Sequence, residues 1–419
     1  MIPGLEHYKT KWQVDSEVSI KPGLQSIGQA LNKLNHPEKS LQVVHLAGTN
    51  GKGSTLSFID SICQVHGLKV GKFMSPCILN IHDQIQINGL PINEKELDSI
   101  FELFAYSGIS GMLTDFELLT CAAFQHFERN HVDIVIIETG MGGLYDSTNV
   151  VTPIVSVITS IELEHTNFLG NTIAQIATHK AGIIKKNRPV IIGKLPTEAY
   201  DVVRQTAQAL QAPLYEYGEH FDVTGEVLAE TYTHKVEQVE LFPLQRSLVG
   251  NHQRMNAGLA ITAFIEVAKV LQVELDADLI KHAIKTTTVP GRFEEVLPNV
   301  YFDGAHNPAS IKALVQTVKM YYPNKKVEII LGMLKDKDVK QVLQILEPIA
   351  TKMQFIEIDN DRALSAKQFY ELSNHENKEV VQDALSAIYA PVQTDTIRIV
   401  TGSLYLLANL REKIKNQSK

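Results

Sequence analysis

The clearest chemical signal in the chain is the segment Val43–Thr55, which reads VVHLAGTNGKGST. A run rich in β-branched residues leads into a glycine-rich turn that contains Lys52, and a helical pattern follows the turn. Glycines let backbone N–H groups surround phosphate oxygens, and the N-terminus of a helix adds partial positive charge. We therefore expect Lys52 to reach the β- and γ-phosphates of a nucleotide, with Ser54 or Thr55 near a magnesium ion.

The match of this loop to the general phosphate-loop pattern is incomplete. Leu46 stands where the first glycine belongs, and Gly53 separates Lys52 from the hydroxyl residue. A glycine-rich turn with a solvated lysine is the alternative interpretation of the stretch taken alone. The absence of a Gly-Lys-Ser/Thr sequence also disfavours a plain phosphate-loop ATPase.

Two further residues follow apolar strands. Glu138 ends the run Val132–Glu138, and a carboxylate at the carboxyl edge of a parallel sheet faces the ligand crevice. An acidic residue there is the usual partner of a phosphate loop and holds magnesium directly or through water. A helix cap or a salt bridge is the alternative for Glu138. His165 follows the strand VSVIT, and a lone histidine is more often a structural residue. An imidazole ligand to magnesium is also unusual, because magnesium prefers oxygen ligands.

Composition limits the class of protein. The 419 residues suffice for two or three domains, and 44% hydrophobic with 21% charged residues is typical of a globular chain with a core. A formal net charge of −8 argues against nucleic acid as a partner. Cys63, Cys77 and Cys121 are too few for a disulfide framework or a zinc site, and we expect them in or near the core. With neither a signal peptide nor a membrane span evident, we expect a soluble, cytoplasmic protein.

Short apolar runs alternate with longer amphipathic segments, which predicts an α/β fold with a largely parallel sheet. Residues 219–248 have an alternating, β-rich pattern that predicts a small antiparallel excursion, and a helix is expected over residues 251–271. Besides this excursion, the predicted strands are Leu41–Leu46, Val132–Glu138, Val155–Ile158, Pro189–Ile192, Val300–Phe302, Val327–Leu331, Met353–Ile358 and Ile397–Val400.

The segment Thr286–Arg292 (TTTVPGR) has the composition of a linker. After it the alternation of strands and helices starts again. We therefore predict a phosphate-loop domain over residues 1–287 and a smaller, Rossmann-like α/β domain over residues 288–419.

The variant loop GTNGKGS resembles that of the folylpolyglutamate synthase/dihydrofolate synthase family, a branch of the Mur-type ligases. Further motifs of that family follow in order along most of the chain: FMSPCI, LTDFELLT, ETGMGGLYDSTNVV, ITSIELEHTNFLGNT, KAGIIK, GNHQRMNA, PGRFE, DGAHNP and TGSLYL. The resemblance implies an ATP- and magnesium-dependent ligase that joins glutamate to a folate-type carboxylate. It also implies an acyl-phosphate intermediate, release of ADP and phosphate, and a monomeric state.

The resemblance also implies roles for individual residues. Residues that match the ATP site are Thr49, Asn50, Gly51, Lys52, Gly53, Ser54, Asn256, Arg292 and Asp303. Residues that match the metal sites are Ser75, Glu138, His165 and Lys180. The lysine that matches Lys180 is carbamylated in the family and holds a second magnesium ion. Without the resemblance, Lys180 would be interpreted as a solvated lysine. Residues that match the substrate pocket are Thr114, Phe116, Glu117, Tyr145 and Asp146.

Arg292, Asp303 and His306 follow the linker, so they would complete a site with the first domain only when the domains close. Arg292 would then place its guanidinium on the γ-phosphate. His306 is a candidate for the base that deprotonates the incoming amine, and His82 is a weaker one.

Two stretches depart from the family pattern. Ile81–Ile85 (IHDQI) lacks the arginine that the family has after its Ser-Pro, and Leu144-Tyr145-Asp146 replaces Arg-Leu-Asp. Both stretches lie on the pterin and acceptor side in relatives. They leave the ATP chemistry intact but put the choice of acceptor in question.

Several alternatives therefore stay open. One is a divergent Mur-type amide ligase with a different acceptor, and another is an ATP-binding paralogue without catalysis. A peptidoglycan-precursor ligase is disfavoured because 47 residues precede Gly48, too few for a nucleotide-sugar domain. Whether the acceptor is dihydropteroate, a reduced folate or both is also left open.

Overall fold

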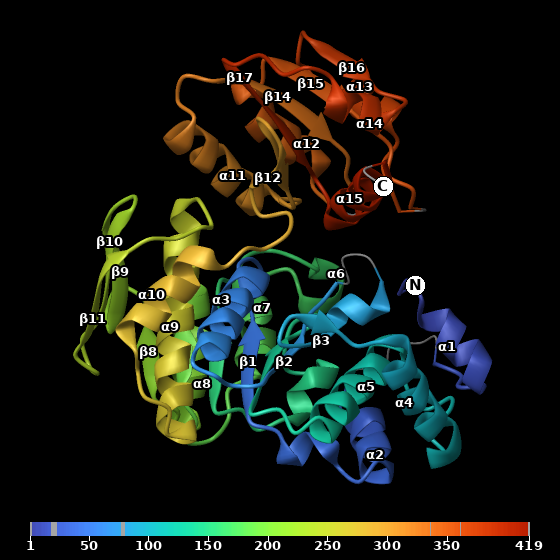
Figure 1. Ribbon diagram of the computed structural model, residues 1–419, viewed down its shortest axis with the longest axis vertical. Coiled ribbons are helices and arrows are strands. Elements are labelled where there is room, and N and C mark those ends of the chain that lie inside the picture. The colour runs from blue at the N-terminus through green and yellow to red at the C-terminus, as the bar shows by residue number, and fades with distance from the viewer. Residues whose placement is uncertain (1, 18–22, 77–79, 336, 361, 418–419) are drawn as a thin grey trace. The chain divides into compact units, whose positions relative to one another are not determined.

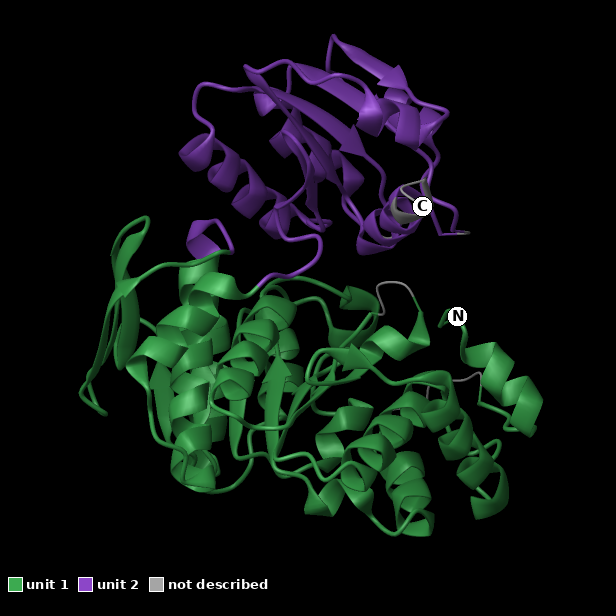
Figure 2. Ribbon diagram, viewed as in Figure 1, with its two compact units in different colours: residues 1–247, 253–287 green, residues 248–252, 288–419 purple. Residues whose placement is uncertain are grey.

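The computed structural model describes residues 2–17, 23–76, 80–335, 337–360 and 362–417. The chain forms two compact units (Figure 2). Unit 1 comprises Met1–Ser247 and Gln253–Thr287, and unit 2 comprises Leu248–His252 and Thr288–Lys419. None of the described helices is both long enough and apolar enough to cross a bilayer.

The main sheet of unit 1 is mostly parallel. Its strands are β1 (Val43–Ala47), β2 (Val70–Phe73), β3 (Ile85–Ile87), β4 (Leu90–Pro91), β5 (Ile134–Glu138), β6 (Val155–Ile158), β7 (Val190–Ile192) and β8 (Leu214–Glu216). Over the described residues the strand order is β4-β3-β2-β5-β1-β6-β7-β8. Strands β2, β5, β1, β6, β7 and β8 run parallel, and β3 and β4 add an antiparallel edge.

Helices cover both faces of this sheet. The helices of unit 1 are α1 (Leu5–Trp12), α2 (Gln25–Lys33), α3 (Lys52–Val65), α4 (Glu94–Ser107), α5 (Asp115–Arg129), α6 (Thr166–Leu169), α7 (Ile173–Ala181), α8 (Thr197–Ala209), α9 (Asn251–Leu271) and α10 (Ala277–Thr286), with 3₁₀ turns η1 (Pro37–Ser40), η2 (Ile81–Gln84) and η3 (Ser147–Val150). Helix α3 packs on β1, β2 and β5, and α10 packs on α3 (Figure 1).

The face of the sheet that is turned away from α3 has two apolar clusters. Helices α1, α2, α4 and α5 form one cluster with β1, β2 and β5. Helices α7 and α8 form the other with β1, β6 and β7. The strands read as continuous Val/Ile runs because both of their faces are buried.

A separate antiparallel sheet follows in unit 1. It consists of β9 (Phe221–Glu226), β10 (Ala229–His234) and β11 (Val239–Leu244), in the order β11-β10-β9. The buried carboxylate of Glu230 on β10 accepts two hydrogen bonds from Arg246, at 2.6 and 2.8 Å, and one from Arg254 on α9, at 2.6 Å. This ion-pair network attaches the small sheet to the start of α9.

Unit 2 has its own sheet, in the order β12-β13-β17-β14-β15-β16 over the described residues. Its strands are β12 (Glu294–Leu297), β13 (Val300–Asp303), β14 (Lys326–Leu331), β15 (Lys352–Phe355), β16 (Lys378–Val380) and β17 (Thr396–Thr401), and its helices are α11 (Pro308–Tyr321), α12 (Val339–Leu346), α13 (Ala366–Leu372), α14 (Ala384–Tyr389) and α15 (Leu404–Gln417), with the 3₁₀ turn η4 (Glu347–Ile349). All strand pairs are parallel except β12–β13. Helices α11, α12 and α13 pack on one face, and α14 and α15 pack on the other, as in Rossmann-like folds.

The predicted fold class is therefore confirmed: a mostly parallel sheet, an antiparallel excursion and a second α/β unit. The predicted strands correspond to β1, β5, β6, β7, β13, β14, β15 and β17 within a few residues at their ends, and the helix predicted over residues 251–271 is α9. Cys63 and Cys121 are buried free thiols, whereas Cys77 lies outside the described residues.

Candidate active site

Four neighbouring parallel strands end at one edge of the unit 1 sheet. The β-ladder pairs Leu46 with Glu138 and Ala47 with Ile158, and it pairs Phe73 with Ile137. The segments that follow β1, β2, β5 and β6 therefore leave the sheet at the same level. This is the edge at which open parallel sheets bind ligands.

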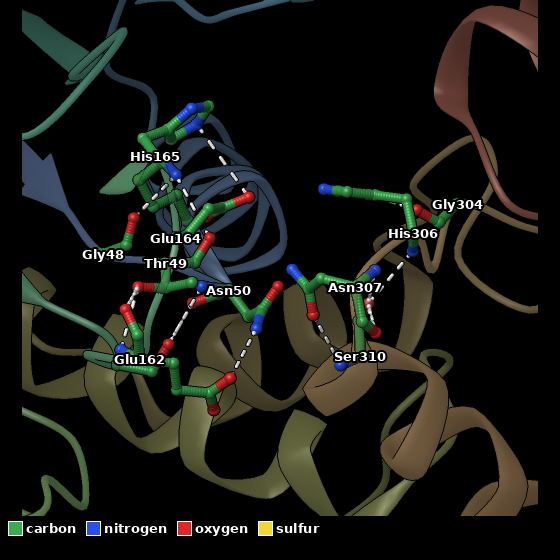
Figure 3. A network of polar contacts seen from close by, with 12 residues as sticks. Gly48, Thr49, Asn50, Glu162, Glu164, His165, Gly304, His306, Asn307 and Ser310 are labelled. Atoms are coloured by element: carbon green, nitrogen blue, oxygen red, sulfur yellow. Dashed lines mark hydrogen bonds and ion pairs between the residues drawn. The ribbon is translucent and has the colours of Figure 1, made fainter. Parts of the chain in front are cut away.

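The glycine-rich loop after β1 is anchored to the segment after β6 (Figure 3). The backbone N–H of Thr49 donates to the carbonyl of Ser160 at 2.9 Å, and that of Asn50 donates to Ser160 Oγ at 2.9 Å. Thr159 Oγ1 donates to the Asn50 carbonyl at 2.6 Å, and the Glu162 N–H donates to Thr49 Oγ1 at 3.1 Å. The loop backbone is held in place by these bonds before any ligand arrives, which is the condition for preorganised electrostatic stabilisation.

The N-terminus of α3 is shaped for an anion. Gly51 occupies the N-cap with φ +88°, and no described side chain caps the helix. The first N–H groups of a helix have no partner inside it, so those of Lys52, Gly53 and Ser54 point outward with the positive end of the helix dipole. Lys52 Nζ donates to the Gly48 carbonyl at 2.8 Å and lies 3.7 Å from Glu138 Oε1. A lysine, a helix terminus and a carboxylate thus meet at one point.

Replacing Gly51 by alanine is expected to weaken ATP binding by at least about tenfold, because a donor geometry worth 1.4 kcal/mol or more would be lost. The positive φ is unfavourable for a residue with a side chain, and a Cβ there would lie 2.6 Å from Asn256 Oδ1. Isothermal titration with ATP checks the affinity. Gly28→Ala on α2 is the control, since no heavy atom lies within 4 Å of its added Cβ. Unchanged affinity in Gly51→Ala would contradict the expected cradle.

Helix α9 brings two polar side chains to this loop from far along the chain. Asn256 Nδ2 donates to Gln253 Oε1 at 2.9 Å, and Gln253 Nε2 donates to Ser54 Oγ at 3.3 Å. Among the described residues no group donates to the buried Asn256 Oδ1, which faces Gly51. An acceptor is therefore presented beside the loop, where a nucleotide could supply the donor.

Lys180 is buried in α7, with 4% of its surface exposed. Burial, reinforced by the charge of Lys52, lowers the pKa of Lys180 to about 7, although Glu164, Asp146 and Glu138 oppose the shift. Its amine forms no hydrogen bond or ion pair with a described residue. A large fraction of Lys180 is thus a neutral amine near pH 7, and a neutral amine is a nucleophile.

The two remaining residues predicted as metal ligands lie at the same edge. His165 is the N-cap of the short α6, has φ +51° and places Nε2 3.9 Å from Glu164 Oε1 (Figure 3). Ser75 is partly buried, two residues after β2. Across the described chain no group of three or more His, Cys, Asp or Glu side chains is arranged as a metal site. The oxygens of Glu138 and Ser75 are nevertheless of the kind that magnesium prefers.

The predicted pocket residues Thr114, Phe116 and Glu117 lie at the start of α5. Thr114 and Glu117 form a capping box, in which Thr114 Oγ1 and its N–H both donate to Glu117 Oε2 at 2.8 Å. Phe116 stacks on Phe73 with ring centroids 5.7 Å apart, and its ring fills the space next to Gly140. Phe116 thus offers an aromatic surface next to the strand ends, while Thr114 and Glu117 fix the helix that positions it.

Asp146 and Tyr145 have different surroundings. Asp146 is buried and accepts hydrogen bonds from the Met141 N–H at 2.8 Å and from both the N–H and the hydroxyl of Thr148. Burial raises the pKa of Asp146, and these bonds oppose that shift. Tyr145 is 53% exposed and lies edge-on to His179, with ring centroids 5.8 Å apart. Asp146 therefore shapes the loop, and Tyr145 is the residue of the pair that faces solvent.

The stretch Ile81–Ile85, which departs from the family pattern, is used for structure. His82 Nε2 bonds to Tyr8 OH at 3.1 Å, which ties α1 to the sheet edge, and its Nδ1 bonds to the Ile92 carbonyl at 2.7 Å. Gln84 is buried and donates to the Met74 carbonyl at 3.2 Å, directly before Ser75. These contacts give His82 a role in packing, and its candidacy as a base stays a prediction. Residues 77–79 lie outside the described chain.

The predicted residues of unit 2 lie close to one another. Asp303 ends β13 and accepts from the N–H groups of Phe293 and Ala305, both at 2.9 Å. Burial raises the pKa of Asp303, and the nearby charge of Arg292 lowers it in part. His306 Nδ1 bonds to the Gly304 carbonyl at 2.8 Å (Figure 3). A carbonyl can only accept, so Nδ1 donates the hydrogen of this bond.

Each unit therefore gathers its own set of predicted residues. Prediction from sequence did not assign roles to Gln253, Thr159 or Ser160, which hold the glycine-rich loop and α9 in place. All three lie inside motifs that were recognised, GNHQRMNA and ITSIELEHTNFLGNT. Their position in those motifs was the sequence signal that could have marked them as residues of the site.

Comparison with known families gives a consistent result. Residues 46–264 match the Mur ligase middle domain, and residues 291–404 match the glutamate ligase domain of Mur ligases. A relative from Bacillus subtilis, dihydrofolate synthase/folylpolyglutamate synthase, is 37% identical over 411 residues, which cover 94% of this chain and 96% of the relative.

Solved structures are similar over the same length. Escherichia coli FolC in complex with DHPP and ADP has a TM-score of 0.89 and 29% identity, and the match covers 99% of this chain and 98% of that one. Mycobacterium tuberculosis folylpolyglutamate synthase complexed with ADP and AMPPCP has a TM-score of 0.83 and 28% identity, with 94% and 95% covered.

Proposed function

Because the chain belongs to the folylpolyglutamate synthase/dihydrofolate synthase family of Mur-type ligases, we propose that it adds L-glutamate to the carboxylate of a tetrahydrofolate with hydrolysis of ATP. The observation that supports this most directly is the meeting of Lys52, Glu138 and the N-terminus of α3 at the carboxyl edge of the sheet. We assign the phosphate-loop domain to residues 1–287. The domain over residues 288–419 contains the further candidate active-site residues Arg292, Asp303 and His306. A cytoplasmic location and a monomeric state stay predictions.

For the metal, the donor set fits magnesium. Glu138 and Ser75 would supply oxygens, with His165 as a third ligand, and a carbamylated Lys180 would supply a further carboxylate for a second ion. The neutral amine of Lys180 can attack the carbon of CO₂. A C–N bond forms, an electron pair moves to oxygen, and the nitrogen loses a proton to water. Bound magnesium would neutralise the charge of the nucleotide phosphates.

The first chemical step is a phosphoryl transfer. An oxygen of the acceptor carboxylate attacks the γ-phosphorus of ATP, the bond to the β–γ bridging oxygen breaks, and ADP leaves. Lys52 and the N–H groups at the start of α3 would stabilise charge that moves onto the phosphate oxygens. Thr49, Asn50, Gly53 and Ser54 fix or form the loop, and Asn256 would accept a hydrogen bond from the nucleotide.

The second step forms the amide. The amino nitrogen of glutamate attacks the acyl carbon of the acyl phosphate, and the bond from that carbon to the phosphate oxygen breaks to release phosphate. We propose His306 as the base for the amine and Arg292 and Asp303 as ATP-binding residues, which are the roles that the family resemblance implies. Phe116 would stack on the pterin ring and Tyr145 would flank the acceptor, while Thr114, Glu117 and Asp146 position that pocket.

The test is a mass-spectrometric assay. The purified protein is incubated with ATP, magnesium and glutamate, and tetrahydrofolate or dihydropteroate is added in separate reactions. Tetrahydrofolate is expected to gain one glutamyl unit, and a gain by dihydropteroate would add dihydrofolate synthase activity. If neither acceptor gains mass while ATP still binds, the folate assignment fails. Residues Ile81–Ile85 would then direct the search for another acceptor.

A further inference from the structure

Two buried polar side chains lie side by side in the middle of the unit 1 sheet. His45 on β1 and Ser156 on β6 are register partners, so their side chains point to the same face. Both are fully buried. They lie at the boundary between the cluster that includes α4 and α5 and the cluster that includes α7 and α8. Polar side chains at such a place require partners, because an unpaired buried polar group is costly.

His45 finds its partner in η3. Its Nε2 lies 2.9 Å from Thr148 Oγ1, which lies 2.5 Å from Asp146 Oδ1. The single hydroxyl hydrogen of Thr148 goes to the carboxylate, so the bond with His45 is donated by Nε2–H. His45 is therefore the Nε2–H tautomer, and among the described residues its Nδ1 receives no hydrogen bond. Burial also lowers the pKa of His45 to about 3, so the ring stays neutral.

The same loop is attached to the end of α7. The Leu144 N–H donates to the His179 carbonyl at 2.7 Å, and Asn149 Nδ2 donates to the Gly182 carbonyl at 3.0 Å. A Cβ on Gly143 would lie only 2.7 Å from the His179 oxygen, so the loop backbone contacts the residue next to Lys180. On the sheet side, Ser156 Oγ donates to the Ile183 carbonyl at 2.9 Å.

We propose that His45 and Thr148 are positioning residues that hold residues 140–149, and through them Lys180, in a fixed place relative to the phosphate loop. His45 lies three residues before Gly48 on the strand that leads into that loop. The hydrogen-bonded chain His45–Thr148–Asp146 thus links β1 to the loop that contacts α7. The statement about Lys180 rests on the proposed function, whereas the link itself does not.

The test compares three variants of the full chain. Thr148→Val removes the hydroxyl at nearly constant volume, and Thr148→Ser keeps it. Thr262→Val is the matched control, because it removes a buried hydroxyl on α9 that bonds Tyr232 OH at 2.9 Å. Amide hydrogen exchange at Leu144 and Gly182 is the first measurement. We expect exchange of the Leu144 amide to be roughly tenfold faster in Thr148→Val, because the loop loses a buried hydrogen bond that opposes its local opening, and unchanged in the other two variants.

The second measurement is the concentration of CO₂ that gives half-maximal ligase activity. It should rise by about tenfold in Thr148→Val, with the KM for ATP unchanged, and stay at the wild-type value in Thr148→Ser and Thr262→Val. Exchange at Leu144 that is the same in Thr148→Val and Thr262→Val would overturn the proposal. If the wild-type protein shows no ligase activity, the proposed function fails, and the exchange data still decide whether the link positions the loop.

Discussion

Lys180→Ala is expected to lower ligase turnover by about 10²–10³-fold, the loss typical of a charged group that stabilises a transferring phosphate. The pKa of Lys180, lowered to about 7, also gives a direction with pH. Only the neutral amine reacts with CO₂, and it is the main form above that pKa, whereas the protonated form dominates below it. Half-maximal activation should therefore require a higher concentration of dissolved CO₂ at pH 6 than at pH 8. Steady-state rates over a CO₂ series at both pH values test this.

Lys186→Ala is the control for this variant, because Lys186 is exposed only six residues further along the chain. It should leave both the rate and the CO₂ dependence unchanged. Short carboxylic acids such as acetate should partly restore Lys180→Ala, since they can place a carboxylate in the space that the side chain leaves. A wild-type rate in Lys180→Ala, or CO₂ dependence that persists in it, would remove Lys180 from the mechanism.

Lys52→Met should reduce turnover by about 10³-fold and weaken ATP binding as well. Lys52 Nζ lies at the helix terminus, 2.8 Å from the Gly48 carbonyl and 3.7 Å from Glu138 Oε1, so its charge is next to the loop. Methionine keeps most of the length of the side chain and removes the ammonium group with its charge and its hydrogen bonds. Single-turnover formation of ADP separates the effect on phosphoryl transfer from the effect on binding.

Lys72→Met is the matched control for Lys52→Met. Lys72 lies on β2 of the same sheet, is similarly buried and pairs with Asp60 Oδ2 at 2.8 Å, so its loss also breaks a lysine–carboxylate pair. We expect it to lower the free energy of unfolding without changing the rate of phosphoryl transfer. Equal losses of turnover in the two variants would mean that Lys52 acts through stability alone.

Local patterns were sufficient for much of this fold. The run before Gly48 predicted β1, and continuous Val/Ile runs predicted the buried strands on either side of it, because burial on both faces leaves a signal in the sequence itself. Strands β2, β3, β4, β8, β12 and β16 were not predicted, since each is short and contains a polar residue or proline. The loop chemistry was predictable for the same local reason: glycines, Lys52 and the helix start are contiguous.

Contacts between distant segments were not predictable from those patterns. Gln253 lies 199 residues from Ser54, and His45 lies 103 residues from Thr148, so neither pairing has a periodic signal. Asp146 could be recognised as part of a motif, but its use as the acceptor for Met141 and Thr148 depends on the folded path of the loop. The contact of His82 with Tyr8 likewise needs α1 to be placed.

The path of α9 has a consequence for how this gene could be divided. Helix α9 follows the antiparallel sheet in sequence, yet Gln253 and Asn256 return to the loop that residues 48–54 form. A fragment that ends at Ser247 would contain every strand of the main sheet but neither Gln253 nor Asn256. In such a fragment Glu230 would also lose the hydrogen bond that Arg254 donates. Split reporters and domain exchanges built on this scaffold therefore need a boundary at or after residue 287, because α9 reaches the nucleotide loop and α10 packs on α3, the helix that follows this loop.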